Sequence, residues 1–157
     1  MLESDPPRSP QDPIAANGQA ERPTRLVRGK GPVVIVDDNP GDVELARIAY
    51  EESVLDNEWL SFTGGEPFLA HMEAVRSGEA MPALVLLDLN MPDLTGFEIL
   101  DRVRSDPFFL DLPIFCMLTS SGDPRARDKA REMGTSGFMV KQHALDGYVA
   151  FFNGLRE

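Results

Sequence analysis

The sequence lacks the features that mark secreted, membrane and nucleic-acid-binding proteins. It has one cysteine, Cys116, so no disulfide can form within the chain, and a reducing, cytoplasmic setting is expected. No apolar run approaches the roughly 20 residues that cross a bilayer, and the N-terminus lacks the apolar core of a signal peptide. The formal net charge of −11 argues against the basic surface that nucleic-acid binding requires.

Proline sets one part of the chain apart. Residues 1–31 hold five of the 13 prolines and few large apolar residues. This composition predicts a flexible N-terminal extension over 1–31, with a short docking or dimerising arm as the alternative. Residues 32–157 have the length and apolar content of one globular domain with its own core.

Short apolar runs alternate with segments of helical periodicity from residue 33 onward. The pattern predicts strands at 33–36, 57–62, 83–88, 112–118 and 136–140, and helices at 40–52, 66–76, 95–104, 124–133 and 144–155. Such alternation favours parallel strands joined by right-handed crossovers, with helices on both faces of the sheet. The predicted fold class is α/β, a doubly wound (βα)5 parallel sheet of strand order 2-1-3-4-5.

The strand predicted at 83–88 ends on a single carboxylate. Its residues are bulky and apolar up to Asp88, and Pro92 then stops regular structure. A strand of this composition is buried on both faces, and ligands of open α/β sheets bind beyond the carboxyl ends of the strands. A carboxylate there is costly unless a cation or hydrogen-bond donors meet it. Asp88 is therefore the first candidate for chemistry.

Polar residues also follow three other predicted strands. Asp37 and Asp38 follow the first, Thr119 the fourth and Lys141 the fifth. Because parallel strands end at one edge, these side chains are expected to converge, and three crowded carboxylates require a cation. Mg²⁺ takes oxygen ligands and bridges to phosphate, and an aspartate can attack a phosphoryl group. The set predicts Mg²⁺-dependent phosphoryl transfer, with the ammonium and the hydroxyl offsetting phosphoryl charge.

Four motifs at these strand ends resemble the receiver domain of bacterial response regulators, the CheY-like group with a flavodoxin-like fold. The motifs are Val36-Asp37-Asp38-Asn39, Leu86-Leu87-Asp88-Leu89-Asn90-Met91-Pro92 with Gly96, Leu118-Thr119-Ser120, and Phe138-Met139-Val140-Lys141. The resemblance covers residues 33 to about 155. It implies that residues 32–157 form a receiver domain.

The resemblance implies an acceptor and a metal site. Asp88 would accept a phosphoryl group from the phosphohistidine of a sensor histidine kinase or a phosphotransfer protein. Mg²⁺ would be held by Asp37, Asp38, Asp88 and the backbone carbonyl of Asn90. Apart from this self-phosphorylation and a slow autodephosphorylation, the resemblance implies that this chain would not be an enzyme.

The resemblance also assigns roles in switching. Lys141 would pair with the acceptor and its phosphoryl group, Thr119 would be the switch hydroxyl, and Phe138 the switch aromatic. A plain core residue is the alternative for Phe138. Asn90 and Ser121 match positions that tune dephosphorylation.

At the level of the whole chain, the resemblance implies a single-domain response regulator of a two-component system, acting as a phosphorelay component or a phosphate sink. The motif at 38–43 is most similar to receivers paired with photosensory kinases such as bacteriophytochromes. Two alternatives stay open: a phosphorylation-independent protein-binding module with the same fold, and a phosphohydrolase with an aspartate nucleophile. The adjacent Asp37 and Asp38 depart from the Asp-x-Asp pattern usual in such hydrolases.

Two features near the C-terminus lead to further expectations. Gln142 follows Lys141 where the family usually has a cis-proline, which leaves a trans or a cis bond open. The last predicted helix is unusually apolar and has Phe151 at the edge of its apolar side. We therefore expect a homodimer formed through the segments 124–133, 136–140 and 144–155, and no nucleic-acid or membrane partner.

Overall fold

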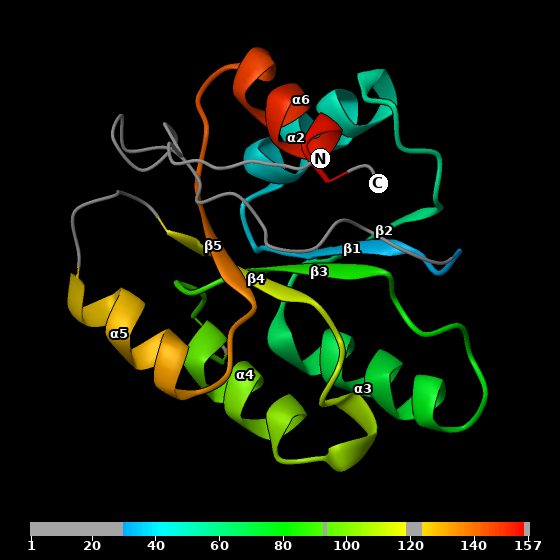
Figure 1. Ribbon diagram of the computed structural model, residues 1–157, viewed down its shortest axis with the longest axis vertical. Helices are drawn as coiled ribbons and strands as arrows, with labels where there is room; N and C mark the ends of the chain where they lie inside the picture. Colours follow the sequence, from blue (N-terminus) through cyan, green and yellow to red (C-terminus); the bar gives the residue numbers. More distant parts are fainter. Residues whose placement is uncertain (1–29, 93, 119–123, 156–157) are drawn as a thin grey trace, which may run out of the picture.

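The computed structural model in Figure 1 describes residues 30–92, 94–118 and 124–155. The strands are β1 (Val33–Val36), β2 (Trp59–Phe62), β3 (Leu84–Asp88), β4 (Ile114–Leu118) and β5 (Gly137–Val140). The helices of the described part are α2 (Pro40–Glu52), α3 (Gly65–Arg76), α4 (Gly96–Arg104), α5 (Pro124–Glu132), α6 (Leu145–Asn153) and the short 3-10 helix η2 (Pro107–Phe109). The extension up to residue 29, and with it nearly all of the segment 1–31, lies outside the described residues.

All five strands pair in parallel, in the order β2-β1-β3-β4-β5. The predicted fold class and strand order are confirmed. Helices α2 and α6 cover one face of the sheet, and α3, α4 and α5 cover the other (Figure 1). No described helix has the length and apolar character needed to cross a bilayer.

The central strands are fully buried because both of their faces carry helices. All residues of β1, β3 and β4 are buried, including Asp88 at the end of β3. Burial on two faces explains why these strands are continuous apolar runs rather than alternating ones. Each face of the sheet therefore has its own apolar core, and Cys116 is a buried free thiol in the core beneath α3, α4 and α5.

The apolar side of α6 is covered by the same chain. Phe151 is only 9% exposed, and its ring lies 6.1 Å from that of Phe115. Phe152 packs edge-on against Tyr50 of α2, with ring centroids 5.3 Å apart. Phe151 is therefore packed within its own chain and gives no support to the expected homodimer, which stays a prediction. The physical reason for this packing is that β4 places Phe115 beneath Phe151 and α2 covers its neighbour.

The sequence did not predict η2. The side chain of Asp106 accepts a hydrogen bond from the backbone N–H of Phe108 at 3.0 Å, and Pro107 occupies the first turn. Both features favour a helical start, but only three residues follow before the chain turns towards β4. Such a short element has no periodicity that a sequence pattern can reveal.

Gly96 allows α4 to start directly beneath the end of β3. A Cβ added there would lie 2.5 Å from the carbonyl oxygen of Asp88 and 2.7 Å from the Cα of Leu89. Both contacts are with backbone, so they cannot be relieved by a rotamer change. We expect Gly96→Ala to lower the free energy of unfolding by about 1 to 3 kcal/mol in urea titrations.

The matched control is Gly41→Ala, in the first turn of α2. A Cβ there would meet only the side-chain oxygen of Asn39, at 3.3 Å. Alanine also has the higher helix propensity, so the change in unfolding free energy should stay within roughly 1 kcal/mol. Equal effects of the two substitutions would contradict the proposed role of Gly96.

Candidate functional site

Two neighbouring strands bring the first two carboxylates together. β1 and β3 pair in register, with Val36 opposite Leu87, so Asp37 and Asp88 follow at the same edge of the sheet. The strand order reverses between β1 and β3, which is where open α/β sheets place their ligands. Asp37 is 0% and Asp88 is 1% exposed, and they are the buried charged residues of the described part. Burial of two carboxylates requires compensating charge.

Asp38 completes a cluster of acids. Single oxygen atoms of Asp37, Asp38 and Asp88 lie within 4.8 Å of one another. Backbone N–H groups fix two of the three carboxylates: Asn39 donates to Asp37 Oδ1 and Asn90 donates to Asp88 Oδ1, both at 3.0 Å. The predicted convergence of these residues is therefore found.

The donor set fits a hard divalent cation. Asp37 Oδ2 is buried and lies 2.9 Å from the Lys141 ammonium, and a carboxylate oxygen has a further lone pair that a cation can take. Asp38 is exposed, which opens the cluster to solvent on one side. Carboxylate oxygens with an open side suit Mg²⁺, which retains several of its waters when bound.

Lys141 joins the acids from the fifth strand. Its ammonium nitrogen lies 2.9 Å from Asp37 Oδ2, 2.9 Å from Asp42 Oδ2 and 3.2 Å from Asp88 Oδ2. Its backbone N–H donates to the carbonyl of Leu118 at 2.8 Å, which fixes the start of the loop after β5. Burial lowers the pKa of Lys141, but hydrogen bonds to Asp42 and Asp37 and the charge of Asp88 outweigh this, so its pKa is raised. The ammonium stays charged.

The sequence prediction did not include Asp42. Asp42 lies in the first turn of α2, where the helix dipole favours an acidic side chain. That role alone accounts for an aspartate at this position, so nothing in the sequence required Asp42 to be assigned to a site. Its position four residues after Asp38, on the helix that starts at the same edge, was the signal that pointed to the site.

Asp88 is difficult to ionise in this setting. Burial raises the pKa of Asp88 to about 6, the charge of Asp37 adds to this, and the Asn90 N–H and Lys141 oppose it. This pKa lies above the ordinary aspartate value of about 3.9. Ionisation of Asp88 above pH 6 therefore lowers the free energy of unfolding. This loss vanishes below about pH 4, where the folded and unfolded states both bind the proton.

Replacing Asp88 by asparagine should therefore stabilise the metal-free protein. We expect Asp88→Asn to raise the free energy of unfolding by about 2 to 3 kcal/mol at pH 8 in the presence of a chelator. The difference should shrink as the pH falls through 6 and close near pH 4. Urea titrations at several pH values measure it, and a gain that is constant from pH 4 to 8 would contradict the proposed cause.

The remaining predicted site residues have varied outcomes. Asn90 contributes its backbone N–H to Asp88, as described above, and its side chain is exposed. Phe138 is 1% exposed, and the guanidinium carbons of Arg127 and Arg131 lie 5.1 and 5.2 Å from its ring centroid. This burial is compatible with both interpretations of Phe138. Thr119 and Ser121 lie outside the described residues.

The bond between Lys141 and Gln142 is trans, since no cis peptide occurs among the described residues. The Gln142 side chain donates to the carbonyl of Val140 at 2.6 Å. This hydrogen bond closes the turn that follows β5. Of the two geometries left open by the sequence, the structure has the trans one.

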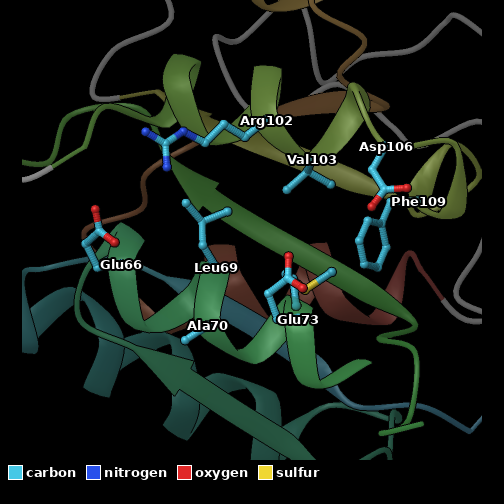
Figure 2. A pocket seen from close by; sticks show the side chains of 9 residues that line it. Glu66, Leu69, Ala70, Glu73, Arg102, Val103, Asp106 and Phe109 are labelled. Atoms are coloured by element: carbon cyan, nitrogen blue, oxygen red, sulfur yellow. The ribbon is translucent and has the colours of Figure 1, made fainter. Parts of the chain in front are cut away.

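A separate pocket of about 310 Å³ lies between α3 and α4. Figure 2 shows Leu69 and Val103 pointing into it, with Glu66 and Arg102 towards one end and Asp106 and Phe109 towards the other. None of Asp37, Asp38, Asp88 and Lys141 lines it. The pocket is therefore not part of the acidic cluster.

Several proteins are similar to this chain. The bacteriophytochrome response regulator RtBRR is 30% identical, over 81% of this chain and 78% of that one, with a TM-score of 0.69. The response regulator Rcp1 of Synechocystis sp. (strain ATCC 27184 / PCC 6803 / Kazusa) is 27% identical over 93 residues, which are 58% of this chain and 63% of Rcp1. The Mn(2+)-bound form of Rcp1 has the same fold, with a TM-score of 0.68 at 22% identity over 79% of this chain and 90% of that one.

A third relative is the chemotaxis protein CheV1 of Helicobacter pylori (strain ATCC 700392 / 26695). It is 25% identical over 114 residues, 73% of this chain and 35% of CheV1. The chain thus spans about a third to two thirds of the length of these two curated relatives. The sequence model of one protein family, the response regulator receiver domain, matches residues 33–151 of this chain. The matched range includes every residue of the acidic cluster. The chain therefore belongs to the response regulator receiver domain family.

Proposed function

We propose that this receiver domain is a phosphorylation-dependent switch of a two-component system, with Asp88 as the acceptor. The observation that carries the proposal is the buried Asp88 carboxylate, which has oxygen atoms of Asp37 and Asp38 within 4.8 Å and the Lys141 ammonium at 3.2 Å. A nucleophile beside a charged donor and a cation site is what phosphoryl transfer needs, because this chemistry depends mainly on positioning and charge neutralisation.

The proposed reaction transfers a phosphoryl group from a phosphohistidine of a sensor histidine kinase or phosphotransfer protein. The ionised Asp88 carboxylate attacks phosphorus, a P–O bond forms, and the P–N bond to the imidazole breaks. Lys141 pairs with the added negative charge, and Asn90 N–H keeps the carboxylate oriented. Asp37, Asp38, Asp88 and the backbone carbonyl of Asn90 would hold Mg²⁺, which neutralises phosphoryl oxygens when bound.

The switching roles extend the proposal. Thr119 is proposed to follow the phosphoryl group with its hydroxyl, and Phe138 to report the change by its rotamer. Asn90 and Ser121 are proposed to set how fast water removes the phosphoryl group. The chain has no enzymatic role beyond this self-phosphorylation and slow autodephosphorylation.

The proposed partner is a histidine kinase, and the similarity to RtBRR supports one of the photosensory group. A homodimer through α5, β5 and α6 stays a prediction that sedimentation at micromolar concentration can check, and it has lost the support of Phe151. The buried free thiol of Cys116 suits a cytoplasmic location.

Mass spectrometry of the intact chain tests the proposal. The purified protein is incubated with acetyl phosphate and Mg²⁺, in parallel with a sample that contains a chelator. One added phosphoryl group in the Mg²⁺ sample and none in the chelated sample is the expected result. An unmodified chain under both conditions would favour a phosphorylation-independent binding module.

A further inference from the structure

The ammonium of Lys141 contacts three carboxylates, of which two belong to the acidic cluster and one does not. An ammonium group has three N–H donors, and the acceptors Asp37, Asp42 and Asp88 lie 2.9, 2.9 and 3.2 Å from its nitrogen. Asp37 and Asp88 belong to the cluster that can hold a divalent cation, and Asp42 does not. Asp42 is thus the partner of Lys141 that a bound cation leaves untouched.

The start of α2 holds Asp42 in place. Asn39 caps the helix, and its side-chain oxygen accepts the backbone N–H of Asp42 at 3.1 Å. The backbone N–H of Asn39 in turn donates to Asp37 Oδ1 at 3.0 Å. The backbone of Asp42 is therefore linked to the acidic cluster through Asn39, and its carboxylate reaches the Lys141 ammonium at 2.9 Å. Its side chain is 31% exposed, against 12% for Lys141.

A bound cation creates a problem for Lys141. The ammonium lies next to oxygen atoms of two of the proposed metal ligands, so a divalent ion would repel it at short range. A buried ammonium without a counter-charge is costly, so it would either leave the site or weaken the binding of the ion. Asp42 supplies a counter-charge outside the metal cluster and within hydrogen-bonding distance.

We propose that Asp42 is a positioning residue for Lys141, which keeps the ammonium at the edge of the sheet when a cation and a phosphoryl group engage Asp37 and Asp88. The role of Asp42 during phosphoryl binding rests on the function proposed above. The pairing of Asp42 with Lys141 is independent of that function. Without Asp42 the ammonium falls back onto Asp37 and Asp88 and competes with the cation.

A double-mutant cycle on cation affinity tests the pairing. The affinity for Mn²⁺ is measured by electron paramagnetic resonance of the free ion, for the full chain and for Asp42→Asn, Lys141→Met and the double variant. We expect Asp42→Asn to weaken binding by roughly threefold to tenfold when Lys141 is present, and by clearly less in the Lys141→Met background. Equal losses in both backgrounds would mean that Asp42 acts only as a distant charge, and would overturn the proposal.

A charge-matched control separates the contact from the net charge. Asp146→Asn removes the same charge from the first turn of α6, where Asp146 is exposed. It should change the Mn²⁺ affinity by less than about twofold. Asp42→Glu, which restores a carboxylate, should recover part of the lost affinity. A loss for Asp146→Asn as large as that for Asp42→Asn, or no recovery with Asp42→Glu, would contradict a positioning role.

Labelling by acetyl phosphate at saturating Mg²⁺ supplies the second readout. At saturation the weaker cation binding no longer limits the rate, so a misplaced Lys141 should still slow Asp42→Asn by about threefold or more, and Asp146→Asn should match the wild type. A wild type that is not labelled would refute the proposed function, while the Mn²⁺ cycle would still decide on the pairing. If the wild type is labelled and Asp42→Asn has the same labelling rate and the same Mn²⁺ affinity, the positioning role of Asp42 is refuted and the proposed function stands.

Discussion

The Asp88→Asn variant is expected to lose phosphoryl acceptance by about 100-fold or more, because the substitution removes the nucleophile itself. An amide oxygen carries no charge and attacks phosphorus poorly. The two neighbouring acids are poor substitutes: Asp37 is buried and oriented by Asn39, and Asp38 is exposed on the open side of the cluster. Intact-mass spectrometry over a time course with acetyl phosphate and Mg²⁺ measures the loss.

The stability of the Asp88→Asn variant itself is the first control for this experiment. Asp88→Asn is expected to be more stable than the wild type at pH 8 in the presence of a chelator, so a loss of labelling in a variant that shows this gain in stability cannot be due to unfolding. Asp101→Asn, which changes an exposed acid on α4, should be labelled like the wild type. Labelling of Asp88→Asn at the wild-type rate would show that another residue is the acceptor.

The second large effect is expected for Asp37→Asn on cation binding. Asp37 is fully buried, its Oδ1 atom accepts the Asn39 N–H, and its Oδ2 atom lies 2.9 Å from the Lys141 ammonium. Removing its charge leaves Asp38 and Asp88 to bind the ion, with Lys141 still beside Asp88. We expect the Mn²⁺ affinity to fall by roughly 100-fold, measured by the free-ion resonance signal.

The fold of Asp37→Asn should be preserved, because the asparagine side-chain oxygen can still accept the hydrogen bond from the Asn39 N–H. Asp56→Asn is the matched control, since Asp56 is exposed and precedes β2 at the opposite edge of the sheet. It should bind Mn²⁺ like the wild type. A loss of less than about threefold for Asp37→Asn would mean that Asp37 is not a ligand.

The sequence predicted the central residues because their positions follow from topology alone. Asp37, Asp88 and Lys141 come at or just after the ends of parallel strands, and any parallel sheet gathers those ends at one edge. An error of one or two residues in a strand boundary does not change this. Strand β4 begins at Ile114 rather than at residue 112, and the site is unaffected.

The features that the sequence did not predict depend on how helices lie over the sheet. The contact of Asp42 with Lys141 requires the orientation of α2 relative to β5, which periodicity does not specify. The burial of Phe151 depends on Phe115, and a strand buried on both faces has no alternation that shows which side a residue takes. Both outcomes are properties of packing between elements rather than of any single segment.

The central claim is that Asp37, Asp38 and Asp88 form one site for a divalent cation. Anomalous diffraction from crystals soaked in Mn²⁺ tests it most directly. We predict one strong peak within about 2.5 Å of carboxylate oxygens from Asp88 and from Asp37 or Asp38. A peak elsewhere on the molecule, or none between these acids at millimolar Mn²⁺, would contradict the account.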